Sequence, residues 1–84
     1  MSVLKPLTKN ITSFTTSRDM EDFLEGILTP LELEQIGIRL KIIKMLKKGI
    51  PQHQIAADLK IGVATVTRGS RMLKEGKFNY PIWA

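Results

Sequence analysis

Four residues between positions 64 and 71 have the types and the spacing of a surface that contacts nucleic acid. In the stretch GVATVTRGSR they are Ala64, Thr67, Arg68 and Arg71. Their spacings of three, four and seven residues place them on one face of a helix. Small side chains with a methyl or hydroxyl group let a helix enter the major groove of DNA, where arginine donates hydrogen bonds to base edges. We therefore predict a DNA-binding face, with Ala64, Thr67 and Arg71 contacting bases.

Positive charge is concentrated in the second half of the chain. The 84 residues carry a net charge of +5, but residues 1–38 hold three basic and six acidic side chains, a balance of −3. Residues 39–84 hold ten basic and two acidic side chains, a balance of +8. Such segregation produces a positive field that suits a polyanion. A solvated lysine-rich helix face is the plain alternative, and the arginines at positions 68 and 71 favour the polyanion.

The composition argues against several other classes of protein. The chain has no cysteine and one histidine, so we expect no disulfide and no metal site. No apolar run is long enough to span a bilayer, and the start MSVLKPLTKN lacks a signal-peptide core. No Ser/His/Asp, Cys/His or paired-carboxylate constellation is present, which argues against an enzyme. We expect a cytoplasmic protein that binds neither a membrane nor a metal and needs no cofactor.

The sequence around the predicted DNA-binding face has the pattern of a helix-turn-helix over residues 51–74. PQHQIAADL predicts a short helix over about 51–59, and Lys60-Ile61-Gly62 predicts a turn. A second helix follows over about 63–74 and ends before Gly76. The expected core between the helices consists of Ile55, Leu59, Ile61, Val66 and Leu73.

Two local features of this motif run against simple propensity. The second helix contains β-branched residues that favour a strand, but packing outweighs a few tenths of a kcal/mol per residue. Lys60 stands where glycine commonly begins the turn in a left-handed conformation. A residue with a side chain is strained there by about 1 kcal/mol.

The first part of the chain predicts an arm and one helix. Residues 1–16 show little periodicity and predict a flexible or loosely docked arm. A helix is expected over about 17–28, with Ser17 as its N-cap and an apolar stripe on one side.

The stretch TPLE at residues 29–32 predicts the start of a central helix. Thr29 is the expected N-cap, proline is tolerated in the first turn, and Glu32 can close a capping box. The helix over about 30–48 is apolar on too wide a face for one neighbour, so we expect it to pack against a second subunit. Gly37 in its interior suggests a close backbone approach.

Two stretches of this sequence resemble the bacterial Trp operon repressor family. LTPLELEQIGIRLKIIKMLKKG, residues 28–49, is similar to its central helix, and IGVATVTRGSRMLK, residues 61–74, is similar to its recognition helix. The resemblance covers about residues 20–74, and ATVTRGS is its most specific part. It implies an all-α, intertwined homodimer with a helix-turn-helix. It also implies a sequence-specific DNA-binding transcriptional regulator, a repressor that binds a double-stranded DNA operator.

The resemblance also implies the domain limits. The helical domain would span residues 17–76, followed by an aromatic tail at residues 77–84. We expect Tyr80 and Trp83 to act as hydrophobic fasteners of this tail. A more speculative alternative has Trp83 folded into the effector cleft as a tethered indole.

An effector site is implied between the central and recognition helices, where members of the family hold a tryptophan. The residues that match it are Arg39, Arg68, Thr29, Thr65 and Gly69. The resemblance implies an indole held between the guanidinium planes of Arg39 and Arg68, with Arg68 also pairing the carboxylate. The plain alternatives are a helix cap for Thr29, an ion pair across subunits for Arg39 and a phosphate contact for Arg68.

DNA contacts are implied at both ends of the helix-turn-helix. With Arg71, which the helical face predicts, the set is Gln52, His53, Gly62, Val63, Ala64, Thr67, Arg71 and Lys74. The sequence departs from the family at Met72, where tryptophan-binding members have a serine, and at Ala56, which replaces a DNA-contacting lysine. The expected corepressor is therefore L-tryptophan or a related small aromatic compound. An effector-independent DNA-binding regulator and a helical protein-interaction module are the alternatives.

Overall fold

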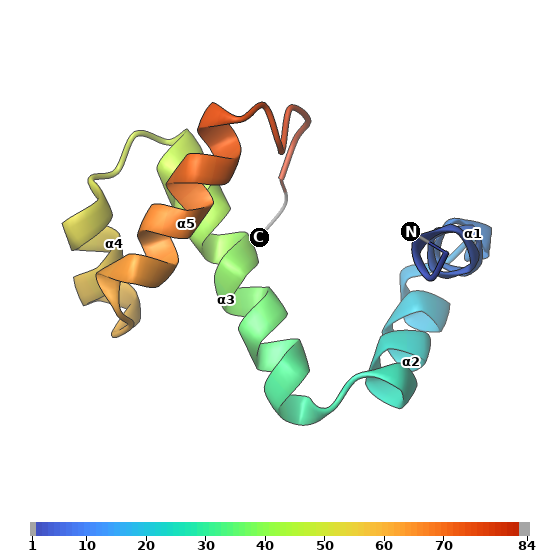
Figure 1. The fold of residues 1–84 in the computed structure, drawn as a ribbon. Helices are drawn as coiled ribbons and strands as arrows, with labels where there is room; N and C mark the ends of the chain where they lie inside the picture. Colours follow the sequence, from blue (N-terminus) through green and yellow to red (C-terminus); the bar gives the residue numbers. More distant parts are fainter. Residues whose placement is uncertain (1, 83–84) are drawn as a thin grey trace. The chain divides into compact units, whose positions relative to one another are not determined.

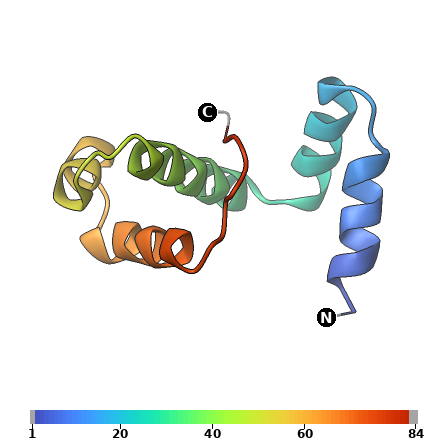
Figure 2. The same cartoon turned by 90° about the horizontal axis from the view of Figure 1, so that it is seen from above.

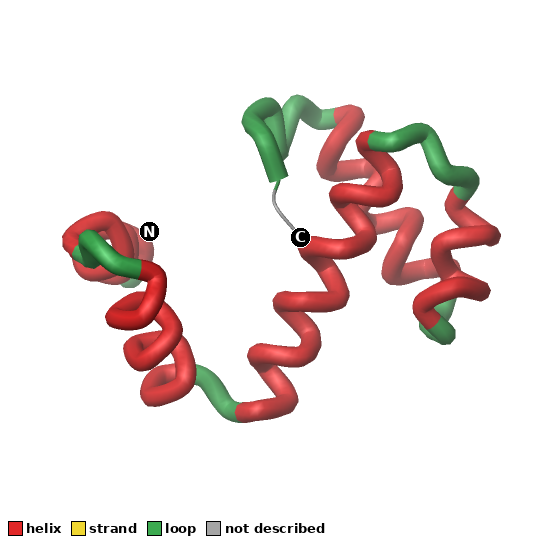
Figure 3. Tube along the Cα trace, turned by 180° about the vertical axis from the view of Figure 1, so that it is seen from behind, coloured by secondary structure: helices red, strands yellow, loops and turns green. Residues whose placement is uncertain are grey.

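The computed structural model describes residues 2–82, and within them the chain is helical with no strand. In chain order the helices are α1 (Leu4–Ser13), α2 (Ser17–Ile27), α3 (Pro30–Lys47), α4 (Gln52–Leu59) and α5 (Val63–Lys74), as Figure 1 shows. Figure 3 shows the same described residues with helices in red, loops in green and no segment coloured as a strand. The predicted all-α fold is confirmed. Trp83 lies outside the described residues.

The chain divides into two compact units, residues 1–33 and residues 34–84. The first contains α1, α2 and the start of α3, and the second contains the rest of α3 with α4 and α5. Helices α1 and α2 contain no buried residue. Side chains buried to 5% exposure or less occur on α3, α4 and α5. The packed core of the described chain therefore lies in the second unit.

Residues 4–13 of the expected N-terminal arm form a regular helix, α1. The hydroxyl groups of Thr8 and Thr12 donate hydrogen bonds to the carbonyl oxygens of Leu4 and Thr8, at 2.9 and 2.8 Å. These hydroxyl groups are therefore satisfied inside the helix, by bonds to the preceding turn. Pro6 stands in the first turn, where a missing N–H breaks no helical hydrogen bond.

Helix α2 forms where it was expected but has a different N-cap. The side chain of Thr16, not Ser17, accepts a hydrogen bond from the Asp19 N–H at 3.2 Å. Across the loop that precedes α2, the rings of Phe14 and Phe23 lie with their centroids 5.1 Å apart. This aromatic pair holds the loop against the helix in addition to the cap.

The predicted capping box at the start of α3 is confirmed. The Thr29 N–H donates to Glu32 Oε1 at 2.8 Å, and the Glu32 N–H donates to Thr29 Oγ1 at 3.2 Å. Two interactions lower the pKa of Glu32. The larger is the hydrogen bond with the Thr29 backbone, and the smaller is the hydrogen bond with the Thr29 side chain. Two of the orphan N–H donors at this helix end are therefore satisfied by the capping box.

The core of the second unit joins α3, α4 and α5. Ile42, Ile55 and Val66 are almost completely buried, and Ala56 lies beside them. Leu59 and Ile61 pack against this cluster, as predicted for the helix-turn-helix core. Figure 2 shows α5 beneath α3 in this unit, and in Figure 1 the two helices cross.

The turn between α4 and α5 has the predicted left-handed residue. Lys60 has φ 56° and ψ 49°, and the Ile61 N–H donates to the Ala56 carbonyl oxygen at 3.0 Å. Ile61 is thereby held against the core, and the two helices meet at a defined angle. The local strain at Lys60 is offset by this packing.

The expected close backbone approach at Gly37 is absent from the described chain. A Cβ atom added at Gly37 would meet nothing within 4 Å. The close approach occurs instead at Gly69, where an added Cβ would lie 3.2 Å from both Ile42 Cγ2 and Ile43 Cδ1. The small residue that brings α3 and α5 together is therefore on α5.

Candidate functional site

The structure brings predicted DNA-contacting residues of α4 and α5 together. The Thr67 hydroxyl lies 2.9 Å from Gln52 Oε1 and 3.0 Å from the Val63 carbonyl oxygen, and it can donate to either. Gln52 begins α4 and Thr67 lies in the middle of α5. This contact links the exposed side of α5 to the start of α4, so the two helices present one continuous polar surface.

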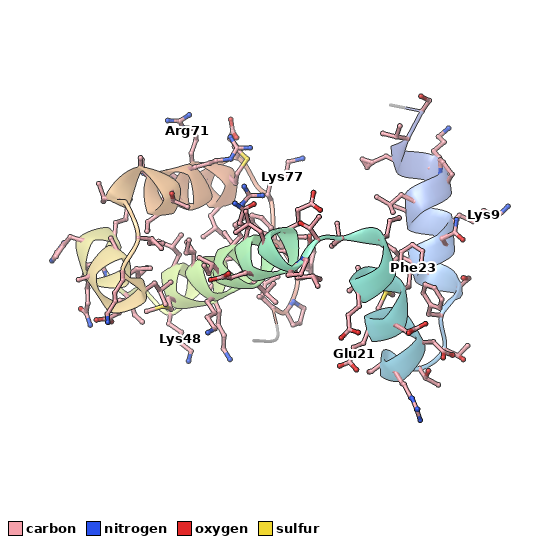
Figure 4. The ribbon with its side chains drawn as sticks, turned by 90° about the horizontal axis from the view of Figure 1, so that it is seen from below. Lys9, Glu21, Phe23, Lys48, Arg71 and Lys77 are labelled. Atoms are coloured by element: carbon pink, nitrogen blue, oxygen red, sulfur yellow. The ribbon has the colours of Figure 1, made fainter. Side chains whose placement is uncertain are left out.

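The predicted DNA-contacting side chains are accessible. Thr67 and Arg71 are both exposed, and Figure 4 shows Arg71 projecting away from the helix. Gln52 is half-buried, and the other predicted contacts, His53, Gly62, Val63, Ala64 and Lys74, are exposed. Within the second unit, therefore, no other part of the chain covers this face, and duplex DNA can reach it.

Ala56 does not belong to this surface. It is 9% exposed and forms part of the core cluster. Its small side chain lets α4 pack on α5. We therefore assign Ala56 to packing and not to DNA contact.

A cavity of about 660 Å³ lies beside α5, on the side that faces α3. Four of the five predicted effector residues line it: Arg39, Thr65, Arg68 and Gly69. Apolar parts of its wall come from Ile42, Ile43, Met72 and Phe78. Arg39 and Arg68, 29 positions apart in the chain, are thus brought to one site from two helices.

Thr29 is the predicted effector residue that does not line this cavity. It lies in the first unit, and both its N–H and its hydroxyl oxygen are engaged with Glu32. The plain interpretation of Thr29 as a helix cap therefore accounts for its contacts.

Gly69 has a packing role in addition to its place at the cavity. Beyond Ile42 and Ile43, Leu46 Cδ1 would lie 3.4 Å from an added Cβ. A larger residue would push α5 away from α3 and widen the cavity between Arg39 and Arg68. The glycine therefore sets the separation of the two helices that form the site.

Residues after α5 also line the cavity, which the sequence did not indicate. Lys77 and Phe78 belong to its wall. The Lys77 N–H donates to the Met72 carbonyl oxygen at 3.0 Å, and Phe78 has a left-handed backbone with φ 61°. The aromatic residues concentrated in the tail could have suggested a contact with the cavity. The sequence of the tail shows no periodicity that would have identified Lys77 and Phe78 as the contacting residues.

The tail is held by its backbone and not by the ring of Tyr80. The Lys47 ammonium donates to the Tyr80 carbonyl oxygen at 2.6 Å, while the Tyr80 side chain is 62% exposed. Our expectation of Tyr80 as a hydrophobic fastener is therefore wrong, because Phe78 is the aromatic residue that reaches the cavity.

Residues 2–82 contain neither a metal site nor a membrane-spanning helix. No group of histidine, cysteine, aspartate and glutamate side chains there could hold a metal ion. None of the described helices combines the length and the apolar character that crossing a membrane requires.

Comparison with known proteins places this architecture in a family. The family model described as Trp repressor protein matches residues 2–84. The Trp operon repressor homolog of Actinobacillus succinogenes is 40% identical over 73 residues, which cover 86% of this chain and 71% of that protein. The homolog of Mannheimia succiniciproducens is 49% identical over 64 residues, covering 75% of this chain and 63% of that protein. No solved structure gave a significant match.

The fold and the exposed face of α5 define a helix-turn-helix protein, a class that binds DNA through the second helix of the motif. The family model matches nearly the whole chain, and this match shows to which family of helix-turn-helix proteins the chain belongs. The chain belongs to the Trp repressor family, whose members are DNA-binding transcriptional regulators and not enzymes.

Proposed function

We propose that this DNA-binding repressor acts as a homodimer on a specific operator, and that a small aromatic effector controls its DNA affinity. The effector is L-tryptophan or a related compound bound in the cavity beside α5. One observation carries the proposal: α5 presents Arg68 to the cavity and Thr67 and Arg71 to the outside. A ligand that contacts Arg68 therefore acts on the same rigid helix that would read DNA.

The proposed DNA contacts follow from the accessible face of the helix-turn-helix. Thr67, Arg71 and the small Ala64 are exposed on α5, so this helix can enter a major groove without steric obstruction from its own side chains. Lysine side chains elsewhere in the basic second unit would contact phosphates or add to the field. Release of counterions from those phosphates makes the affinity depend steeply on salt.

The proposed homodimer follows from apolar surface that the protomer leaves uncovered. Ile36 and Leu40 on α3 are 49% and 38% exposed, and in the first unit Ile27 and Leu31 are 55% and 63% exposed. A small domain with its core confined to one unit gains stability when a partner covers such residues. A second copy would also present two reading helices to two half-sites of an operator.

The proposed effector mechanism is a shift in the position of α5. Guanidinium groups stack on aromatic rings and pair with carboxylates, so Arg39 and Arg68 suit the two ends of an aromatic acid. The effector would bind the DNA-competent arrangement more tightly than other arrangements. Because Gly69 touches α3 directly, occupation of the cavity acts at the contact that sets the spacing of the two helices.

The proposal is tested by selecting binding sites from random duplexes, with and without a panel of aromatic amino acids and indoles. We expect an enriched, two-fold symmetric sequence, and an affinity for it that the effector raises by at least about tenfold. If a sequence is enriched but none of the compounds changes the affinity for it, the protein is an effector-independent regulator. Absence of any enriched sequence would favour a protein-interaction module and overturn the operator proposal.

A further inference from the structure

The second half of α3 carries a group of positive charges separate from those of α5. Between Glu34 and Asp58 the chain has no acidic residue and five lysine or arginine residues. Lys41 and Lys48 are exposed and stand seven positions apart, so they lie on one side of the helix. Lys48 follows the last residue of α3, and its N–H donates to the Lys44 carbonyl oxygen at 3.2 Å, which continues the helical geometry. The surface formed by Lys41 and Lys48 is called the lysine face below.

The lysine face points away from α5. Helix α5 meets α3 at Ile42, Ile43 and Leu46. At about 100° per residue, the lysine face lies roughly 100–160° around the helix from these three residues. In Figure 4, Lys48 and Arg71 accordingly project to opposite sides of the second unit. The lysine face and the predicted DNA-reading face of α5 are therefore two separate surfaces.

The second subunit proposed above would approach α3 from another direction. Ile36 and Leu40, the exposed apolar residues of α3 assigned to that contact, lie roughly 80–140° around the helix from the lysine face. Lysine is depleted in the buried parts of protein interfaces. A two-fold interface across the lysine face would also bring the like charges of two copies together. We therefore expect the lysine face to stay exposed in the dimer.

The residue types of the lysine face suit the phosphates of a nucleic acid and not its bases. A lysine ammonium group meets a phosphate as a point charge. Reading bases takes arginine, asparagine or glutamine side chains, and the lysine face has none of these. Glu34 lies on the same side of α3 about two turns before Lys41, so the positive surface is limited to the second half of the helix. Contacts made here would therefore not depend on sequence.

We propose that the lysine face holds a second DNA duplex by its phosphates while α5 reads the operator, so that one repressor bridges two DNA segments. The inference rests on the proposed function for the first duplex and goes beyond it for the second. A straight duplex seated against Thr67 and Arg71 does not reach the lysine face, because α3 and α5 lie between the two surfaces. Wrapping one duplex around the unit would cost bending energy. The occupant of the lysine face is therefore a separate duplex segment.

A bridging assay with the full chain tests the lysine face. The selected operator duplex is fixed on beads, and a labelled duplex of unrelated sequence is added in solution. We expect the beads to retain the labelled duplex when the protein is present. Lys41→Gln combined with Lys48→Gln should reduce this retention at least about fivefold and make its logarithmic salt dependence shallower by about 1.8, since each lost phosphate contact contributes about 0.9. Fluorescence anisotropy should show less than about a twofold change in affinity for the operator, because screening weakens charges on the far side of the unit.

A matched double variant separates the lysine face from net charge. Lys5→Gln combined with Lys9→Gln on α1 removes the same charge from exposed residues and should leave retention and operator affinity unchanged. An equal loss of retention in this control would overturn the proposal, as would retention that survives substitution of Lys41 and Lys48. Equal losses of retention and of operator affinity in the Lys41 and Lys48 variant would place these lysines on the operator duplex itself and also overturn it.

Failure of the lysine face and failure of the proposed function give different results. A protein that binds its selected operator but retains no second duplex refutes only the lysine face. If no operator is selected, the labelled duplex is added to immobilised protein. Binding that is weakened by substitution of Lys41 and Lys48, and not by Arg71→Ala, then supports the lysine face although the operator proposal fails.

Discussion

Helices α2 and α5 are similar in length but differ in what holds them in place. Helix α2 is stabilised by a local cap from Thr16 and by one aromatic pair, and it buries no residue. Helix α5 has no side-chain cap, yet its Val66 is completely buried and its Gly69 touches α3. Local signals suffice to form a helix, but only contacts between distant residues place a helix well enough to position a site.

The largest expected effect comes from the core that positions α5. Ile55→Ala removes a completely buried side chain and should lower the free energy of unfolding by about 2–5 kcal/mol. Ile27→Ala on α2, where the side chain is 55% exposed, should lower it by less than about 1 kcal/mol at low protein concentration. Urea unfolding of both variants measures the difference. Equal losses would break the contrast between the helices and show that a partner subunit buries Ile27.

The next effect concerns the outer face of α5. Arg71→Ala should weaken binding to the selected operator by about 1–3 kcal/mol, because the base contact proposed for Arg71 would be lost. Fluorescence anisotropy with labelled duplexes measures this change, and Arg18→Ala on α2 is the charge-matched control. A loss of the same size for Arg18→Ala would show that net charge, and not the face of α5, governs binding.

A smaller effect is expected from adding one methyl group at each of two glycines. Gly37→Ala enters open space and should stabilise the protein by roughly 0.5–1 kcal/mol, since alanine favours a helix. In Gly69→Ala the added Cβ meets two isoleucine side chains at 3.2 Å. The free energy of unfolding of this variant should be about 1–3 kcal/mol lower than that of Gly37→Ala. Thermal unfolding ranks the pair. Destabilisation by Gly37→Ala would instead place a partner's backbone close to α3.

The smallest effect is a pH dependence at the start of α3. Hydrogen bonding to Thr29 lowers the pKa of Glu32 below 4.5, so the carboxylate stabilises the fold above that value and loses its contribution as the pH falls through the lowered pKa. Glu32→Gln should therefore lower the midpoint of thermal unfolding slightly at pH 7 and by less at pH 3. Glu34→Gln on the same helix is the control, and an equal change at both pH values would argue against the charge.

Most of the fold was predictable because helix ends depend on residues within one turn of each other. TPLE predicted the start of α3, Gly76 the end of α5 and Lys60 the left-handed turn, and all three are confirmed. The helix that was not predicted is α1. Residues 4–13 show little apolar periodicity, so no helix was predicted there, whereas in the structure threonine hydroxyl groups bond back to the preceding turn of a helix.

The candidate site was only partly predictable. The resemblance named Arg39 and Arg68, and the structure places both at one cavity, while the role of each predicted DNA contact stays a prediction. Lys77 and Phe78 were missed because their approach to α3 depends on how the chain turns after Gly76, and their spacing carries no sign of it. The close approach expected at Gly37 stays a prediction for a second subunit, because within the chain an added Cβ there meets nothing within 4 Å.

By itself, then, the sequence determined helices α2 to α5, the capping box of α3 and the order of small and basic residues on α5, because these follow from interactions between residues a few positions apart. The tertiary structure decided that Arg39, Arg68 and Lys77 surround one cavity, and that Thr67 and Arg71 remain outside it. Those positions depend on packing between residues far apart in the chain, around Ile42, Ile55 and Val66.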